Sequence, residues 1–511
     1  MKARPIALLV PWLCLLPWIP ATVAGEDGAA TRFPQGVAAG EITPRSAVVW
    51  TRTDGPASLR LEVADNREFR DPLSLAVETV EARDFTVQAT LGDLDPATEY
   101  AYRFVVVGGG DGEDGSGEEV RGRFRTAPEP NADVLVRFLV GGDVGGQGNC
   151  RHPEEGYPAF GPMAELDADF FVANGDMIYA DNACPEIGPG GRPNIPGDFL
   201  PIALVDWAHP GAARETILAH WRYNRADFQQ RRLLAGTPIY AQWDDHEAIN
   251  DFGAAWTEWP IEPQRPGWDR LVEAGREGLF LWNPMTVHPE EPGRIYRSFR
   301  WGKSLELFLL DARSYRSRND LVDSPSNGKT MLGAEQLAWL KKSLTASDAT
   351  WKIVSSDVPL SVPTGADAKL WGRDSFADGD SDNFSKRTGF ERELLDLLTF
   401  LDRENVKNIV FVVTDVHFAA NLRYTPDLDG DGDPLIFHEL VSGPLNAYAT
   451  PVPAELDPTL GPAILYGEGG FFNFSYVRLS RSGDGTVHLV ADVRDAEGKP
   501  RFGSRLELVP E

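Results

Sequence analysis

Six short apolar runs in this 511-residue chain each reach an aspartate at or near the C-terminal end. They fall between residues 133 and 510, where strand-like runs alternate with helical patterns such as residues 334–344 and 391–401. This alternation predicts an α/β domain, and in open α/β sheets ligands bind outside the carboxyl ends of the strands. We therefore expect the runs to bring their acids to one crevice. They end at Asp143, Asp176, Asp244 with Asp245, Asp311, Asp357 and Asp415.

The region before residue 133 follows a different pattern. Between residues 33 and 128, polar and apolar residues alternate as in half-buried strands, and turn-rich stretches separate the runs. The segment from Leu94 to Tyr100 has the residue spacing of the tyrosine corner in fibronectin-like sandwiches. We therefore predict an all-β sandwich domain over residues 33–128 and an α/β domain over residues 133–510. The predicted strands of the sandwich are 46–53, 58–64, 85–91, 99–107 and 122–127.

The N-terminus has the layout of a secretory signal peptide. Lys2 and Arg4 precede an apolar stretch over residues 6–20, and small residues follow at 21–25. A retained membrane anchor is the alternative, but three prolines interrupt the stretch and leave it short for a spanning helix. We predict cleavage of residues 1–24, a secreted or periplasmic location, and no stable membrane anchor.

Cysteine usage agrees with export. One of the three cysteines lies in the predicted signal peptide, so Cys150 and Cys184 remain in the mature chain. A disulfide between them is the natural interpretation in an oxidising compartment. Two buried free thiols are the alternative.

The charge balance limits the possible partners. The chain has 49 Lys and Arg residues against 77 Asp and Glu residues, a formal net charge of −28. Binding a nucleic-acid backbone or an anionic membrane requires a basic surface, so both are excluded as general functions. A small phosphate ester is not excluded, because bound cations reverse the local charge of an acidic site. The oligomeric state is left open.

The acids at the strand ends favour a metal site. Taken singly, each one could be a turn residue or a helix cap. Gathered together, they would raise one another's pKa values and destabilise the fold unless a cation neutralised them. Of the eight histidines, His246 and His417 fall inside these segments. A site made mostly of carboxylates, with few imidazoles, suits iron(III), manganese or calcium. It does not resemble a zinc site built from histidines alone.

Several segments together resemble one family, the PhoD-like (alkaline phosphatase D) branch of the metallophosphoesterases, which is related to the purple acid phosphatases. The segment GDMIYAD (175–181) is similar to their GDxxYAD signature. The resemblance covers nearly the whole mature chain and implies a four-layer α/β metallophosphoesterase sandwich behind a fibronectin- or immunoglobulin-like all-β domain. The other segments that carry it are DDHE (244–247), LDARSYR (310–316), TMLGAEQLAWL (330–340), TDVH (414–417) and GPLNA (443–447).

The resemblance implies two or more metal ions, with iron(III) and calcium favoured and manganese or zinc as alternatives. It makes Asp176 the bridging carboxylate and Tyr179 a phenolate on iron(III), although Tyr179 could instead be a packing aromatic. Many PhoD-like proteins have a cysteine near Asp143, and a carboxylate in place of a thiolate favours harder ions. For Asp357, turn chemistry explains the residue equally well. The implied metal ligands are Asp143, Asp176, Tyr179, Asp245, Asp357, Asp415 and His417.

Two further residues are candidates for catalysis. His246 could donate a proton to the leaving alkoxide or stabilise its charge. Arg313 could bind a phosphate through both guanidinium arms, and an ion pair with Asp311 or another acid is the alternative. The acidic run 427–433 resembles a calcium loop, but its twelfth position is a histidine, so a solvated hairpin loop is favoured over an independent calcium site.

These features predict a secreted metal-dependent phosphoric ester hydrolase of the alkaline phosphatase type. The same metal core would accommodate a phosphodiesterase acting on nucleotides or phospholipid head groups. A different class of protein is the remaining alternative, namely a non-catalytic secreted calcium-binding or adhesion protein that keeps the acids as structural sites.

Overall fold

The computed structural model describes residues 32–108, 117–260, 262–365, 368–379 and 387–511. The predicted signal peptide, residues 1–24, lies outside the described residues. Within the described ranges the strands form sheets of nine, seven and four strands. None of the helices in these ranges combines the length and the hydropathy needed to cross a bilayer.

The nine-stranded sheet contains three of the runs that end in aspartate. These runs form β8, β9 and β10, which are parallel neighbours. In the described residues the strand order is β20 (Leu506–Leu508), β19 (Val487–Asp495), β18 (Asn473–Arg481), β8 (Arg137–Gly141), β9 (Phe170–Asn174), β10 (Ile239–Gln242), β1 (Val37–Gly40), β2 (Ala47–Arg52) and β5 (Thr86–Leu91).

The seven-stranded sheet contains the other three runs. They form β12, β13 and β14, which are again parallel neighbours. In the same described ranges the order is β11 (Arg297–Trp301), β12 (Leu305–Leu309), β13 (Trp351–Ser355), β14 (Ile409–Val413), β16 (Phe437–Val441), β15 (Ala419–Tyr424) and β17 (Ala463–Glu468).

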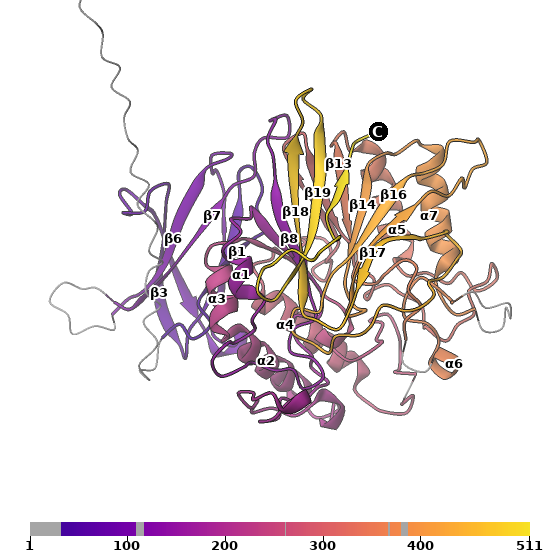
Figure 1. Cartoon of the computed structure of the whole chain (residues 1–511). Coiled ribbons are helices and arrows are strands. Elements are labelled where there is room, and N and C mark those ends of the chain that lie inside the picture. Colours follow the sequence, from indigo (N-terminus) through magenta and orange to yellow (C-terminus); the bar gives the residue numbers. More distant parts are fainter. Residues whose placement is uncertain (1–31, 109–116, 261, 366–367, 380–386) are drawn as a thin grey trace, which may run out of the picture.

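The two large sheets pack face to face, and helices cover their outer faces (Figure 1). Alternation along β8 shows how the residues divide: Phe138 and Val140 face the second sheet, whereas Leu139 packs under the helices. The result is the predicted four-layer α/β architecture. The first sheet is covered by α1 (Phe160–Met163), α2 (Ala212–Arg225), α3 (Phe228–Leu234) and α4 (Trp268–Trp282). The second sheet is covered by α5 (Gly333–Ala346) and α7 (Glu391–Arg403). The short helix α6 (Ala368–Trp371) comes between β13 and α7 in the sequence.

The N-terminal residues are all-β, as predicted, but their strands divide between two sheets. The four-stranded sheet has the order β4 (Leu73–Thr79), β3 (Ala57–Ala64), β6 (Glu99–Val106) and β7 (Glu119–Arg125). The opposing strands β1, β2 and β5 belong to the nine-stranded sheet, because β1 pairs in parallel with β10. In the tyrosine corner, the Asp95 amide donates to the Tyr100 hydroxyl over 2.9 Å. Since one sheet runs across the expected boundary, the division at residues 128 and 133 stays a prediction.

Hydrogen bonds join the two large sheets where their central strands end. Asn174, at the end of β9, donates from Nδ2 to Ser355 Oγ over 3.0 Å and to the Val412 carbonyl over 2.9 Å. Ser355 Oγ in turn donates to Gln242 Oε1, at the end of β10, over 2.6 Å. The carboxyl ends of β9 and β10 therefore meet those of β13 and β14, and the acids that follow these strands gather at one place.

Candidate metal centre

Each of the six strand-end acids lies two residues after the last residue of its strand. Every one of them is buried except Asp415, which is partly exposed. The common spacing has a simple origin, because the chain needs one residue to leave the sheet before a side chain can turn back over its edge. The acids and their strands are Asp143 (β8), Asp176 (β9), Asp244 (β10), Asp311 (β12), Asp357 (β13) and Asp415 (β14).

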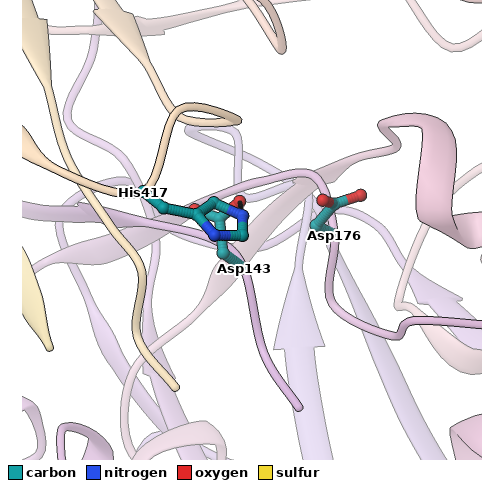
Figure 2. A group of neighbouring side chains, drawn as sticks. All are labelled: Asp143, Asp176 and His417. Atoms are coloured by element: carbon teal, nitrogen blue, oxygen red, sulfur yellow. Dashed lines mark ion pairs between the residues drawn. The ribbon is translucent and has the colours of Figure 1, made fainter. Parts of the chain in front are cut away.

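The first cluster contains Asp143, Asp176 and His417 (Figure 2). The Tyr179 hydroxyl lies beside His417. His417 Nε2 lies 3.3 Å from Asp143 Oδ1 and 2.8 Å from the Tyr179 hydroxyl. One ligand atom from each of Asp143, Asp176 and His417 lies within 4.8 Å of the others. The four side chains come from three separate strand ends and could hold one cation.

A backbone carbonyl sets the tautomer of His417. Its Nδ1 donates to the Tyr448 carbonyl over 2.6 Å, so the proton of the neutral ring lies on Nδ1. Nε2 then keeps its lone pair and faces Asp143 and Tyr179. This is the tautomer that a histidine needs to bind a metal through Nε2.

The second cluster contains Asp176, Asp245 and His246, so Asp176 belongs to both clusters. His246 Nδ1 contacts Asp181 Oδ1 at 2.7 Å, and Nε2 lies 3.9 Å from Asp245 Oδ1. The ring of Tyr179 stacks on the His246 ring, with centroids 4.0 Å apart. Burial by itself would lower the pKa of His246, but Asp181 and then Asp245 raise it to about 10.

The local backbone is unusual at the positions that carry these side chains. Asp143, Asp176, Asp415 and His417 have φ values of 62°, 52°, 73° and 62°. Residues other than glycine seldom adopt this left-handed region, and such strain concentrates at functional sites. Gly443, in the GPLNA segment, has φ 106°, and a Cβ there would lie 2.3 Å from Asp143 Oδ2.

The electrostatics of both clusters fit bound cations. Burial, followed by repulsion from Asp245, raises the pKa values of Asp176 and Asp415 well above their usual range. Several buried carboxylate oxygens of the site receive no hydrogen bond from any of the described residues. Such oxygens are costly in the interior unless a cation or another donor meets them. They are Asp143 Oδ2, Asp244 Oδ2, Asp245 Oδ1, Asp357 Oδ2 and Asp415 Oδ2.

Arg313 does not face the crevice with a free guanidinium. It is fully buried; its Nε donates to Asp244 over 2.7 Å, and its two terminal nitrogens donate to Asp374 over 2.8 and 2.7 Å. The contacts correspond to the ion-pair alternative, with Asp244 and Asp374 as the nearby acids. These carboxylates occupy both edges of the guanidinium, which favours the ion pair, and the phosphate contact stays a prediction.

Asp311, Asp357 and Asp415 belong to neither of the two clusters within the described residues. Asp311 accepts from the indole of Trp243 over 2.8 Å and from two backbone amides of its own turn. Asp357 accepts from the Ala312 amide and lies 3.7 Å from Arg313 Nε. Turn chemistry accounts for Asp311 Oδ1. Asp311 Oδ2 and Asp357 Oδ2 both lack a hydrogen-bond donor among the described residues.

Two carboxylates that the sequence reasoning left without a role support the site. Asp181 holds His246, and Glu247 accepts from the amides of Asp176 and Asp244 over 3.0 and 2.8 Å. Both were visible as the last residues of the GDMIYAD and DDHE segments. Asp374, which pairs with Arg313, lies outside every such segment and had no sequence signal.

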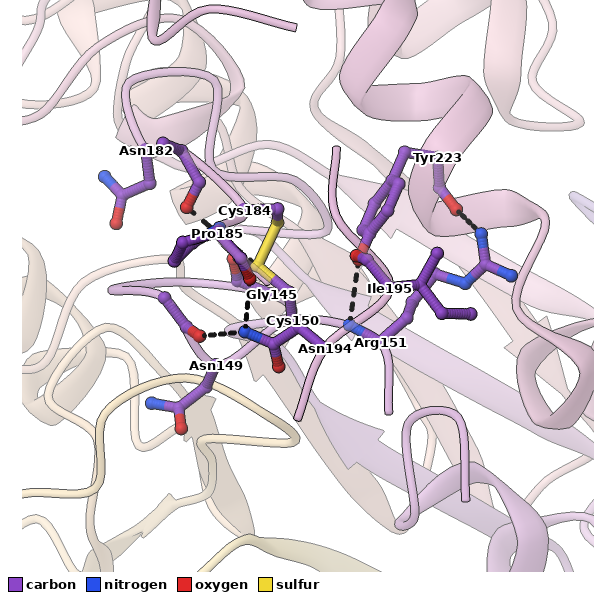
Figure 3. Close-up of a disulfide and its surroundings, with 12 residues drawn as sticks. Gly145, Asn149, Cys150, Arg151, Asn182, Cys184, Pro185, Asn194, Ile195 and Tyr223 are labelled. Carbon is purple, nitrogen blue, oxygen red and sulfur yellow. Dashed lines mark hydrogen bonds between the residues drawn. A yellow bond between two sulfur atoms is a disulfide. The ribbon is translucent and has the colours of Figure 1, made fainter. Parts of the chain in front are cut away.

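A disulfide joins the segments that follow the first two strand-end acids (Figure 3). Cys150 follows Asp143, and Cys184 follows Asp181. Asn194 strengthens the connection, because its Nδ2 donates to the Gly148 carbonyl over 2.9 Å and to the Pro185 carbonyl over 3.0 Å. The loop that carries Asp143 is therefore tied to the loop that carries Asp176.

Comparisons with known proteins agree with this fold. A family model described as PhoD-like phosphatase matches residues 144–464, and one described as PhoD-like phosphatase, N-terminal domain, matches residues 20–128. Alkaline phosphatase D of Bacillus subtilis (strain 168) is 25% identical over 433 residues, which are 78% of this chain and 67% of that protein.

Two solved structures have the same fold. The structure of PhoD has a TM-score of 0.71 at 18% identity and covers 94% of this chain and 93% of its own. The purple acid phosphatase PPD1 from seeds of yellow lupin (Lupinus luteus) has a TM-score of 0.56 at 12% identity, over 93% of this chain and 73% of its own. These matches confirm the resemblance and the fold class predicted from the sequence.

Proposed function

This chain belongs to the PhoD-like phosphatase family and is an enzyme, and we propose that it hydrolyses small phosphate esters with two or more bound metal ions. The observation that carries this proposal is the pair of buried acid and histidine clusters that share Asp176. A carboxylate between two clusters can bridge two cations, which is the arrangement of two-metal hydrolytic sites.

The donor set supports the choice of metals. Asp143, Tyr179 and His417 offer carboxylate, phenolate and imidazole donors on one side of Asp176, and Asp245 offers a further carboxylate on the other. Asp415 belongs to neither cluster, and its carboxylate interacts electrostatically with that of Asp245. Cys150 is bonded to Cys184, so it supplies no thiolate. This set suits iron(III) beside calcium, with manganese or zinc as alternatives. When bound, such ions would supply a nucleophile from water and neutralise the phosphoryl oxygens.

His246 has the position of a proton donor. Its Nδ1 is held by Asp181, and its Nε2 faces the side of the site where Asp245 lies. The two carboxylates favour the protonated ring, and the stacked Tyr179 ring fixes its orientation. An imidazolium held in this way can protonate a leaving alkoxide, an effect of about 10²- to 10⁴-fold in rate.

Export is part of the proposal. It is supported by the signal-peptide pattern of residues 1–24 and by the disulfide, since such bonds persist in oxidising compartments. We place the enzyme outside the cytoplasm, in the periplasm or the medium.

The decisive experiment replaces the shared carboxylate. Asp176→Asn should lower the bound metal measured by elemental analysis and reduce phosphate ester hydrolysis by at least about 10³-fold, because both clusters lose a ligand. Asp348→Asn, whose side chain is 93% exposed, is the matched control and should keep both. Full activity in Asp176→Asn would overturn the proposal.

The same assay separates the alternatives. Faster turnover of a diester than of a monoester by the unchanged enzyme would favour the phosphodiesterase reading. A metal-binding protein without catalysis would hydrolyse neither ester, and His246→Ala would leave its metal content and behaviour unchanged.

A further inference from the structure

Tyr448 is an exposed aromatic residue beside a buried site. Its exposed fraction is 55%, whereas the preceding residues Leu445, Asn446 and Ala447 are fully buried. An aromatic ring offers a large apolar face for packing, so an exposed one next to a ligand site is a candidate contact for the ligand.

The main chain fixes Tyr448 relative to the metal cluster. Its carbonyl accepts from His417 Nδ1 over 2.6 Å, and its amide donates to Gln147 Oε1 over 3.1 Å. Both contacts use backbone atoms of Tyr448. The phenol ring can therefore be removed by mutation while the hydrogen bond that orients His417 stays.

A continuous path of contacts runs from Tyr448 to His246 on the other side of the site. The backbone amide of Gln147 donates to Asn182 Oδ1 over 2.6 Å, and Asn182 Nδ2 donates to Asp181 Oδ1 over 2.9 Å. Asp181 then binds His246. This path, which we call the rim, links the histidine of the first cluster to the proton donor of the second and begins at Tyr448, whose side chain is exposed.

The chemistry of an ester explains what the rim would contact. The phosphoryl group requires the cations and His246, which lie in the buried clusters. The organic group must then project away from the buried clusters, toward the exposed residues beside them. An aromatic side chain next to that group can bind a ring in it by stacking, and such contacts tolerate variation in the ring.

We propose that Tyr448 is a specificity-determining residue that stacks on the organic group of the phosphate ester and selects esters of aromatic or heteroaromatic alcohols. This inference rests on the proposed ester hydrolysis and adds the substrate class to it. The ring acts on the part of the substrate that does not react, so its contribution falls mainly on binding.

The test compares ligands with and without a ring. In Tyr448→Ala, the KM for phenyl phosphate and the inhibition constant of phenylphosphonate should rise by about fivefold or more, the effect of losing one stacking contact. The inhibition constants of methylphosphonate and inorganic phosphate, which have no ring, should change by less than about twofold on the same scale. Tyr448→Phe keeps the ring and should restore most of the affinity for phenylphosphonate.

Two readouts guard against a structural explanation. Metal content should match that of the unchanged enzyme, since the backbone contact to His417 remains. Phe228→Ala, which removes another exposed aromatic ring at the start of α3, should leave the preference for phenylphosphonate over methylphosphonate unaltered.

Distinct outcomes overturn the two proposals. An unchanged inhibition constant for phenylphosphonate in Tyr448→Ala, or an equal loss for all four ligands, would refute the role of Tyr448 in an enzyme that is still active. No hydrolysis by the unchanged, metal-loaded enzyme would instead refute the proposed function.

Discussion

Asp181 is the residue whose role depends most directly on one contact. Its Oδ1 holds His246 Nδ1 at 2.7 Å, and its Oδ2 accepts from the Asn250 amide over 3.1 Å. Asp181 belongs to neither acid and histidine cluster within the described residues. It therefore acts on the orientation and charge of His246 rather than on the metal.

Asp181→Asn should reduce kcat by about 10- to 100-fold, the usual effect of losing a partner that orients a functional side chain. The metal content should stay the same, because no cluster ligand changes. Steady-state kinetics and elemental analysis on the same preparation check both parts. A loss of metal, or an unchanged kcat, would contradict the role given to this residue.

Glu439 supplies a prediction about pH that is independent of the metal clusters. It is fully buried in β16, accepts hydrogen bonds from the Tyr424 hydroxyl and the Leu360 amide, and burial raises its pKa to about 7. The folded protein therefore keeps a proton on Glu439 that the unfolded chain releases near its ordinary pKa. This contribution to stability is complete below pH 4.5 and is lost as the pH rises toward 7 and beyond.

Glutamine does not ionise, so Glu439→Gln should remove this loss of stability at high pH. For the raised pKa of Glu439, the loss in the free energy of unfolding amounts to about 3 kcal/mol. The measurement is the free energy of unfolding in urea at pH 5 and pH 8 for both proteins. We expect the decrease between the two pH values to be smaller in the variant. An equal decrease in both proteins would show that Glu439 does not titrate in this range.

At the scale of elements, the turns after β9 and β10 act as one unit. Glu247 lies in the short 3-10 helix Asp245–Glu247, and its carboxylate accepts from the amides of Asp176, Met177 and Asp244. One buried side chain thus fixes two loops that each carry a candidate ligand. The disulfide ties one of these loops to the loop after β8 in a similar way.

Glu247→Gln should lower both metal content and thermal stability. An amide presents N–H groups to backbone donors, and each donor left unmatched costs about 1–3 kcal/mol. Glu439→Gln is the matched control, because it makes the same change at a buried position outside the site. Equal metal content in the two variants would show that Glu247 has no special part in the site.

The elements themselves were largely predictable. Strands and helices have a local period, so the six strand-end runs and the helices α5 and α7 could be read from the sequence. Which strands pair was not predictable from the same pattern. The pairing of β1 with β10 joins Gly40 to Ile239, and no local signal connects positions so far apart in the chain.

At the scale of the whole molecule, the continuous nine-stranded sheet makes the N-terminal residues part of the framework of the site. Removing β1, β2 and β5 would turn β10 into an edge strand and uncover the core beneath it. A chain that starts at residue 133 should therefore aggregate or fail to unfold cooperatively. A chain that starts at residue 32 is the control, and an equal melting temperature for the two would contradict this prediction.

The net charge also belongs to this scale. A chain of net charge −28 is an unexpected partner for an anionic ester. The acids that matter are those in the two clusters, where bound cations would reverse the local field. The acids outside the clusters contribute to solubility.

The sequence by itself determined the kinds of elements and the acids at their ends, because periodicity and motif residues are local properties. It also identified the family, since the motifs recur in a recognisable order. The tertiary structure decided which of these side chains meet. It paired Arg313 with Asp374, 61 residues away, and placed Asp181 on His246. Such contacts depend on how two sheets pack and how loops return over their edges, and no short stretch of sequence contains that information.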